Sequence, residues 1–148
     1  MKISEAGLKL IMQFEGLRLR AYRCPAGVWT IGYGHTGGAG APEVWDGLRI
    51  SAQEAEAILK KDLAGFETAV AGMVKMELTQ AQFDVLVSFA YNCGVGALKA
   101  STLLRRVNAG AFDAVPGELM KWTKAKGREL PGLVRRRRAE AALWRGLP

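Results

Sequence analysis

The amino-acid sequence predicts an α+β fold, in which a helix, a small sheet and a long linking helix precede an all-helical lobe. Three observations lead to this prediction. Apolar residues follow Ser4 at helical spacing as far as Gly16. The segment 17–50 is rich in glycine and aromatic residues and contains short alternating runs, which are typical of strands and turns. Capping-box patterns at Ser51 and Thr79 each open a run with helical periodicity.

The first two helices are marked by residues suited to their N-terminal ends. Ser4 is a candidate N-cap for the first helix. The pattern at Ser51 predicts a helix over 52–74 with an apolar stripe that includes Ala55 and Leu59. A helix of that length is long enough to connect two lobes.

The second half of the chain is expected to be mainly helical. The helix after Thr79 is apolar nearly all round, so we expect it to be central and buried. The later predicted elements are a break over 92–96, a helix from the cap Ser101 to Val107, a helix over 111–120, a loop over 124–127, a turn at Pro131-Gly132 and a last helix over 134–144. The length of the chain predicts one domain, 1–148. We expect this domain to have two lobes that are joined by the long helix over 52–74. The first lobe covers roughly residues 15–60, and the second covers residues 1–14 together with 75–148.

The positive charge is concentrated near the C-terminal end. The chain has 21 Lys and Arg residues and 14 Asp and Glu residues, for a formal net charge of +7. Residues 1–120 contain 12 basic and 12 acidic side chains, whereas residues 121–148 contain 9 basic and 2 acidic ones. Such a segment favours a polyanionic partner, which is a nucleic acid, a membrane surface or an anionic polymer.

Several classes of protein are excluded by composition. No apolar run approaches the length of a membrane span, and the N-terminal segment lacks the pattern of a secretory signal, so we expect a protein kept in the cytoplasm until it is released. Two cysteines, Cys24 and Cys93, form at most one disulfide, and with His35 they lack the spacing of a zinc site. Phosphate-binding and dinucleotide-binding glycine motifs are absent from the sequence.

Candidate catalytic residues occur where the first helix meets the predicted sheet. Glu15 lies at the end of the helix, where the negative end of the helix dipole and any burial favour the neutral carboxyl that a general acid needs. Cys24 lies in a turn, and Thr30 lies in the strand that follows. A hairpin over 17–34 would fold both back beside the helix end, giving a cleft with an acid, a thiol and a hydroxyl.

The pattern of these three residues resembles that of a known family. Eight residues separate Glu15 from Cys24 and five separate Cys24 from Thr30, as in the Glu-x8-(Asp or Cys)-x5-Thr spacing of the phage-type lysozymes, the endolysin family of glycoside hydrolases. Further stretches that resemble the family, in the same order, are 14–16, 30–36, 89–94, 101–103 and 132–144. The resemblance therefore covers essentially the whole chain.

The resemblance implies a lysozyme-like fold and cleavage of the β-1,4 bond between N-acetylmuramic acid and N-acetylglucosamine in peptidoglycan. Glu15 would be the general acid, Thr30 would position water, and Cys24 takes the place of the usual Asp. A thiol has a reference pKa of about 8.5, so Cys24 is mostly neutral at neutral pH unless a neighbour such as Arg23 lowers its pKa. As a thiolate it is able to act as a base, an electrostatic stabiliser or a nucleophile.

Cofactor, location and partner are also implied by the resemblance. No metal or organic cofactor is expected. The protein would wait in the host cytoplasm until a separate holin opens the inner membrane, and would then reach the periplasm and the cell wall. We expect a monomer whose partner is peptidoglycan.

Other polar residues are candidates for substrate contacts or for structural roles. Ser101 and Thr102 are helix caps or residues facing the sugar-binding cleft, and Tyr33 is a further candidate for substrate binding. His35, the sole histidine, is expected to be a structural residue that forms hydrogen bonds near the sheet. Cys93 is expected to be a packed thiol rather than a partner of Cys24 in a disulfide.

Aromatic residues divide between core and surface roles. Trp29 and Trp45 are candidates for stacking on sugars or for the core of the small lobe, and Trp122 and Trp144 are expected in the core of the helical lobe.

The arginine run 135–138 allows three interpretations. In the first, it is a solvated helix face from which one or two arginines turn inward to pair with a buried acid, for which Glu15 is a candidate. In the second, residues 121–148 are attracted to the anionic cell envelope, in the extreme case as a membrane-disrupting helix. In the third, the run binds nucleic acid, but no helix-turn-helix or RNA-binding signature supports that. The narrow apolar stripe of the last helix argues against membrane disruption as the sole activity.

Overall fold

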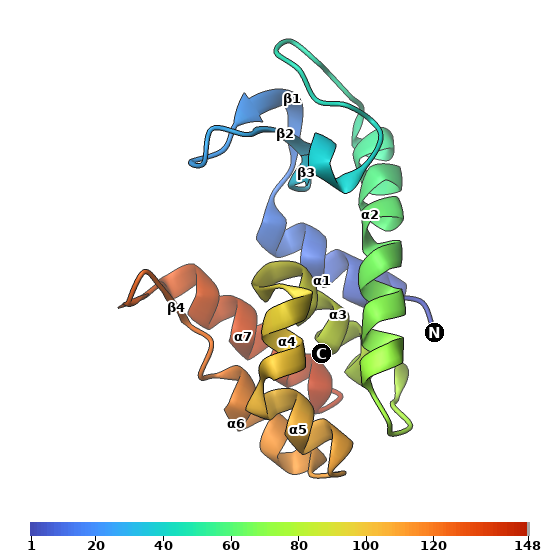
Figure 1. Cartoon of the computed structure of the whole chain (residues 1–148), viewed down its shortest axis with the longest axis vertical. Helices are drawn as coiled ribbons and strands as arrows, with labels where there is room; N and C mark the ends of the chain where they lie inside the picture. The colour runs from blue at the N-terminus through green and yellow to red at the C-terminus, as the bar shows by residue number, and fades with distance from the viewer. Residues whose placement is uncertain (148) are drawn as a thin grey trace. The chain divides into compact units, whose positions relative to one another are not determined.

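The computed structural model describes residues 1–147 and confirms the α+β class. The chain divides into two compact units. We call Glu15–Gly65 the sheet unit, and Met1–Phe14 together with the chain from Phe66 onward the helical unit. Each unit is drawn with its elements in Figure 1. None of the helices in the described residues combines the length and the apolar character needed to span a membrane.

The sheet unit contains a three-stranded antiparallel sheet in the order β1-β2-β3. Its strands are β1 (Arg18–Arg23), β2 (Trp29–Gly32) and β3 (His35–Thr36), followed by a short 3-10 helix, η1 (Gly37–Ala39). The segment that was expected to form short strands therefore does so. The chain segment that follows β3 pairs with β1 again through an isolated bridge between Arg20 and Arg49. This bridge lies along the edge of β1 that does not pair with β2.

His35 is a structural residue, as the sequence predicts. Its side chain is almost fully buried, with Nδ1 2.7 Å from Asp62 Oδ2 and Nε2 2.8 Å from the Pro42 carbonyl oxygen. A carbonyl oxygen only accepts, so Nε2 carries a proton and donates it to Pro42. These contacts tie β3 to the connection that follows it and to helix α2 (Ala52–Met73).

Helix α2 begins where the capping box at Ser51 predicts. The Glu54 N–H donates to Ser51 Oγ at 3.0 Å, and the Ser51 N–H donates to Glu54 Oε1 at 3.0 Å. These reciprocal bonds satisfy two of the amides that a helix start leaves unpaired. The helix passes from the sheet unit into the helical unit between Gly65 and Phe66.

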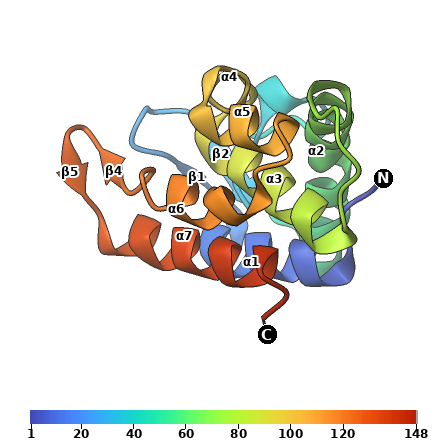
Figure 2. The same ribbon diagram turned by 90° about the horizontal axis from the view of Figure 1, so that it is seen from below.

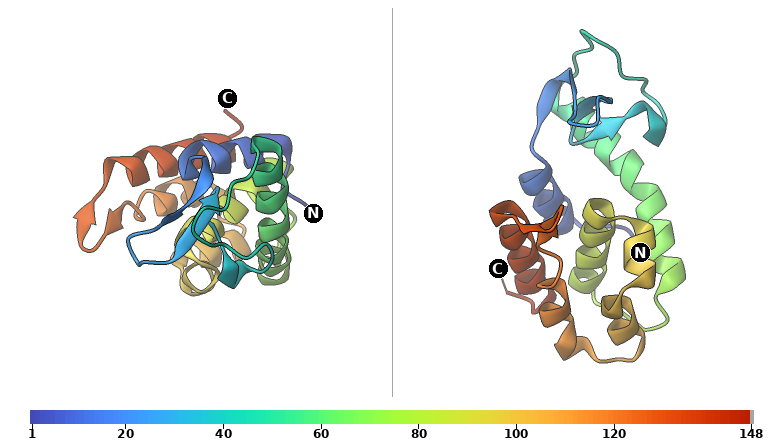
Figure 3. Two further views of the ribbon diagram at one scale, coloured as in Figure 1. Left: turned by 90° about the horizontal axis from the view of Figure 1, so that it is seen from above. Right: turned by 60° about the vertical axis from the view of Figure 1, so that its left-hand side comes forward.

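The helical unit is built around α3 (Gln80–Cys93), which is buried continuously from Phe83 to Ala90. The predicted central position of this helix is therefore confirmed, and the Thr79 capping box is present. The other helices of the unit are α1 (Glu5–Glu15), α4 (Val95–Ala100), α5 (Thr102–Asn108), α6 (Val115–Leu119), which follows the 3-10 turn η2 (Phe112–Ala114), and α7 (Pro131–Trp144). Helix α7 packs against both α3 and α6 (Figure 3, right).

Three predictions for this unit were wrong in detail. The expected break over 92–96 is present, because α3 ends at Cys93 and Gly94 caps it, but it is shorter than expected and a helix that was not predicted, α4, begins at Val95. The expected loop over 124–127 is the tip of a two-stranded hairpin, β4 (Lys124–Ala125) and β5 (Arg128–Glu129), which projects beyond α6 and α7 (Figure 2). Helix α7 starts at Pro131, because proline suits the first position of a helix, where no N–H is needed.

The N-terminal residues are held by two acidic side chains. The Ile3 N–H donates to Glu67 Oε2 at 2.6 Å, and the Ser4 N–H donates to Asp84 Oδ1 at 3.0 Å. The Ser4 hydroxyl also donates to Asp84 and accepts from the Gly7 N–H at 3.3 Å, which confirms Ser4 as a cap. A Cβ at Gly7 would lie 2.6 Å from Asp84 Cγ, so the close approach of α1 to α3 requires glycine at this position.

Candidate functional site

The β1–β2 hairpin brings Cys24 and Thr30 together. Tyr22 pairs with Thr30, and two residues further along the Cys24 N–H donates to the Val28 carbonyl oxygen at 3.0 Å. Residues two apart on a strand share a face, so Cys24 and Thr30 are diagonal neighbours on one face of the hairpin. Gly27, with a φ of +81°, closes the turn by donating its N–H to the Cys24 carbonyl oxygen at 2.7 Å.

Thr30 is held in the middle of the sheet. It pairs with Tyr22 on β1 and with Thr36 on β3, and only 4% of its surface is exposed. Its hydroxyl donates to the Val28 carbonyl oxygen at 3.0 Å. A hydroxyl that donates to the backbone keeps its lone pairs for a proton from another molecule, such as water.

The environment of Cys24 favours the thiolate. The pKa of the half-buried Cys24 thiol is lowered, first by a hydrogen bond from the backbone of Val28 and second by one from Ala26. Burial acts in the opposite direction, and a hydrogen bond from the Thr30 side chain adds to the lowering of the pKa. The Thr30 hydroxyl thus has two acceptors for its one proton, the Val28 carbonyl oxygen and the sulfur.

The role expected of Arg23 is not the one observed. Its guanidinium lies over the Trp29 ring, 4.8 Å from the centroid, and the lowered pKa of Cys24 has backbone and hydroxyl donors as its causes. Alternation along the strand explains the difference, because adjacent residues of a strand point to opposite faces. Trp29 is half-buried beneath this cation, and Trp45 is 56% exposed.

The two cysteines should react with iodoacetamide over different pH ranges. Both are free and half-buried, but burial raises the pKa of Cys93 whereas hydrogen bonds lower the pKa of Cys24. Because the thiolate is the reactive form, we expect alkylation of Cys24 to begin at lower pH than alkylation of Cys93. Peptide mass spectrometry across a pH series measures both sites in one sample. Coincident profiles, or earlier reaction at Cys93, would contradict the prediction.

Glu15 is the last residue of α1, as the sequence predicts. Gly16, with a φ of +72°, ends the helix and turns the chain into β1 three residues after Glu15. The Glu15 side chain is half-buried. Phe14, the residue before it, lies 5.9 Å from the Arg136 guanidinium, measured to the ring centroid. That the Glu15 carboxyl faces Cys24 and Thr30 stays a prediction.

The other candidate residues have clear local roles. Ser101 caps α5, because its hydroxyl accepts from the Leu104 N–H at 3.0 Å and donates to the Leu98 carbonyl oxygen at 2.6 Å. The Thr102 hydroxyl accepts from Arg105 at 2.6 Å, and Tyr33 is buried in the turn that joins β2 to β3. The cap interpretation of Ser101 is confirmed, whereas contact of these residues with sugars stays a prediction.

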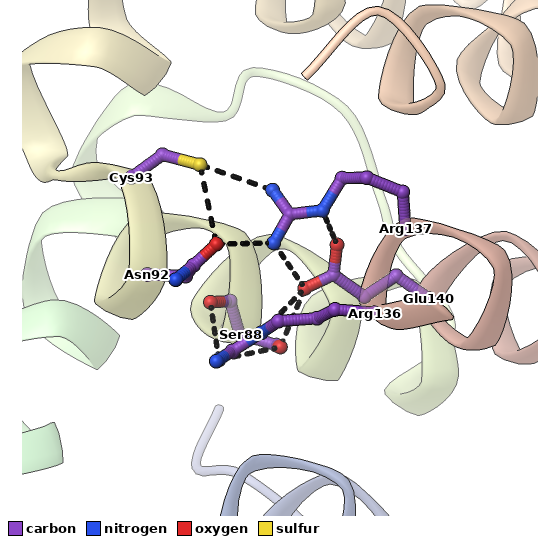
Figure 4. A network of polar contacts seen from close by, with 6 residues as sticks. All are labelled: Ser88, Asn92, Cys93, Arg136, Arg137 and Glu140. Atoms are coloured by element: carbon purple, nitrogen blue, oxygen red, sulfur yellow. Dashed lines mark hydrogen bonds and ion pairs between the residues drawn. The ribbon is translucent and has the colours of Figure 1, made fainter. Parts of the chain in front are cut away.

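A buried charge network around Glu140 joins α7 to α3 (Figure 4). Arg137 Nε lies 2.9 Å from Glu140 Oε1, and Arg136 Nε lies 3.6 Å from Glu140 Oε2. Ser88 donates to Glu140 Oε2 at 2.6 Å, and Arg137 also donates to Asn92 Oδ1 at 2.5 Å. Two arginines do turn inward, as one interpretation held, and the acid between them is Glu140.

The network surrounds two titratable groups, the Glu140 carboxyl and the Cys93 thiol. Burial raises the pKa of Glu140, and Arg137, Ser88 and Arg136 act in the opposite direction. Cys93 is a packed thiol as expected, 3.0 Å from an Arg137 nitrogen that donates to it. The spacing of three and four residues between the arginines and Glu140 is the signal in the sequence that could have identified this acid.

The comparisons with known proteins decide the family. The model of the phage lysozyme family matches residues 12–140. The chain belongs to the phage lysozyme family. A curated relative, an endolysin of Acyrthosiphon pisum secondary endosymbiont phage 1, is 45% identical over 97% of this chain and 98% of its own length.

Solved structures place the chain in the lysozyme-like fold class. The muramidase domain of SpmX from Asticaccaulis excentricus superimposes with a TM-score of 0.88 at 43% identity, over 97% of each chain. A mutant of P22 lysozyme, from phage P22, gives a TM-score of 0.89 at 38% identity over 97% of this chain and 98% of that one. As a member of the phage lysozyme family, the chain is a glycosidase.

Proposed function

We propose that the chain hydrolyses the β-1,4 bond between N-acetylmuramic acid and N-acetylglucosamine in peptidoglycan, and so lyses the host cell. The pairing of Cys24 and Thr30 on one face of the hairpin, in a member of the phage lysozyme family, is the observation that carries this proposal. A thiol with a lowered pKa beside a hydroxyl with free lone pairs is suited to holding and activating a water molecule.

The proposed reaction uses one proton donor and one proton acceptor. Glu15 is the general acid and gives a proton to the glycosidic oxygen as the bond to the sugar breaks. Water held by Thr30 attacks the sugar carbon and loses a proton to the Cys24 thiolate. The reaction leaves Glu15 as a carboxylate and Cys24 as a thiol, and exchange with solvent restores both.

Further contacts with the substrate are proposed besides the catalytic residues. Thr102 and Tyr33 are proposed to contact the sugars, and Ser101 is proposed to support Thr102 through the cap of α5.

The exposed basic side chains among residues 121–148 are proposed to attract the protein to the anionic cell envelope. We further propose that the protein acts as a monomer, without a cofactor, and reaches the wall from the host cytoplasm after a holin opens the membrane.

The products formed from purified peptidoglycan test the proposed function. We expect soluble fragments with reducing N-acetylmuramic acid ends, because water is the proposed nucleophile. Mass spectrometry of the digest distinguishes these ends from anhydro-muramic ends, which a lytic transglycosylase would form. Anhydro ends, cleavage only within the peptides, or no soluble fragments would overturn the proposal.

Substitutions at Cys24 test its role. If the thiolate accepts the proton from water, Cys24→Ser should reduce the rate by roughly 10²–10⁴-fold, whereas Cys24→Asp should preserve activity because a carboxylate is also a base. Reducing-end release from peptidoglycan provides the rate. Cys93→Ser is the matched control, because that thiol belongs to the buried network. A fully active Cys24→Ala variant would show that the sulfur takes no part.

A further inference from the structure

A hollow in the helical unit lies between α6 and α7. Its volume is about 360 Å³, and it is lined by Pro116, Gly117, Met120, Arg138, Ala141 and Arg145. The two helices pack against each other, and Figure 2 shows α6 beside α7. The volume is within the range of about 300–1,000 Å³ that is usual for sites of small ligands.

Two arginines in the wall of this hollow have no acidic partner among residues 1–147. Arg138 and Arg145 are exposed, and their guanidinium groups make no hydrogen bond or ion pair within residues 1–147. Arg138 lies on α7 and Arg145 is the C-cap of the same helix, seven residues further on, which is close to two turns, so both lie on the same side. Arg137, by contrast, is already bound to Glu140.

The other charged groups near the hollow are paired or lie outside its wall. Lys121, next to Met120, is paired with Glu118 at 2.9 Å. Asp113 lines an adjoining hollow, which also contains Arg145, Pro116 and Trp144, but it does not line the hollow with Arg138. Of the residues that the structure describes, the hollow between α6 and α7 is therefore lined by two cations and no anion.

The remaining wall is apolar. Pro116 and Ala141 are buried, and Met120 is half-buried beside them. A guanidinium forms two parallel hydrogen bonds with one phosphate group, and an apolar floor favours carbon atoms next to that group. A ligand that satisfies both parts of the wall carries a phosphodiester beside a hydrocarbon portion.

We propose that this hollow binds the headgroup of an anionic phospholipid. Arg138 and Arg145 hold the phosphate, and the glycerol with the first acyl carbons lies on Met120 and Ala141. The site anchors the helical unit on a membrane surface without a membrane-spanning segment. This proposal goes beyond the proposed hydrolysis and does not rest on it, so a Glu15→Gln variant should bind the lipid as well as the unchanged protein does.

Calorimetric titration with a short-chain lipid tests the proposal. The probe is dihexanoyl phosphatidylglycerol below its micelle concentration, with dihexanoyl phosphatidylcholine and glycerol phosphate as comparison ligands. We expect saturable binding of one lipid per chain, and at least about tenfold weaker binding of either comparison ligand. The double variant Arg138→Gln/Arg145→Gln should bind phosphatidylglycerol at least about tenfold more weakly.

A matched double variant distinguishes binding of the lipid in the hollow from non-specific electrostatic attraction between the basic protein and the anionic lipid. Arg128→Gln/Arg135→Gln removes the same charge from exposed positions that do not line the hollow, and should weaken binding less than about threefold, because salt screens distant charges. Thermal unfolding of both variants shows that each is folded. Equal weakening in the two double variants, absence of saturation, or equal binding of phosphatidylcholine or glycerol phosphate would overturn the proposal.

Discussion

Replacing Glu15 by glutamine is expected to reduce peptidoglycan hydrolysis about a thousandfold, because the amide has no proton to give to the glycosidic oxygen. Glutamine has nearly the same shape, so the half-buried end of α1 should remain folded. Release of reducing ends and loss of turbidity of permeabilised Gram-negative cells measure the effect.

The other end of the same helix provides the control for Glu15. Glu5 is exposed in the first turn of α1, and Glu5→Gln should leave the rate unchanged. Full activity of the Glu15→Gln variant would refute its assignment as the acid. Killing of cells at the original rate without release of sugar ends would instead indicate membrane disruption by the basic C-terminal segment.

Removing the acid of the buried network should produce the largest loss of stability. Glu140→Ala leaves Arg137, which is 0% exposed, without the carboxylate that lies 2.9 Å from its Nε. Uncompensated buried charge of this kind costs about 3–5 kcal/mol of unfolding free energy. Denaturant unfolding of the purified variant measures the change.

Two further variants distinguish the loss of stability caused by breaking the network from the general effect of removing a charge. Glu129→Gln removes an exposed carboxylate and should change the unfolding free energy by less than about 0.5 kcal/mol. Adding Arg137→Met to Glu140→Ala should cost less than the sum of the single changes, because the second substitution removes one stranded cation. A loss at Glu140 no larger than that at Glu129 would contradict the assigned role.

Local patterns in the sequence were sufficient to predict where most of the helices lie. Ser51 and Thr79 identify helix starts because a capping box depends on residues only three apart. The projecting hairpin β4–β5 was missed because its strands have two residues each and no apolar alternation. Helix α4 was missed because Gly94 and Gly96 suggest a turn, although Leu98 anchors the helix in the core.

The candidate site could be predicted only in part. The placement of Cys24 and Thr30 follows from a short hairpin, which sequence reasoning handles well. The two largest contributions to the lowered pKa of Cys24 are hydrogen bonds from backbone groups of Val28 and Ala26, and no side-chain pattern reveals these groups. The pairing of Arg136 and Arg137 with Glu140 lies within α7, at spacings of four and three residues, but the contact of Glu140 with Ser88 of α3 depends on how α7 is rotated against α3, which is a tertiary property.

Gly7 has a consequence for the engineering of this protein. Exchange of a helical glycine for alanine is a common way to stabilise a protein, and Gly65 and Gly72 of α2 have nothing within 4 Å of an added Cβ. At Gly7 the same exchange would push α1 away from Asp84, the carboxylate that holds the Ser4 amide and hydroxyl. A thermostabilised variant therefore has room for new methyl groups on the long linking helix, while the first helix has to keep its least helix-favouring residue.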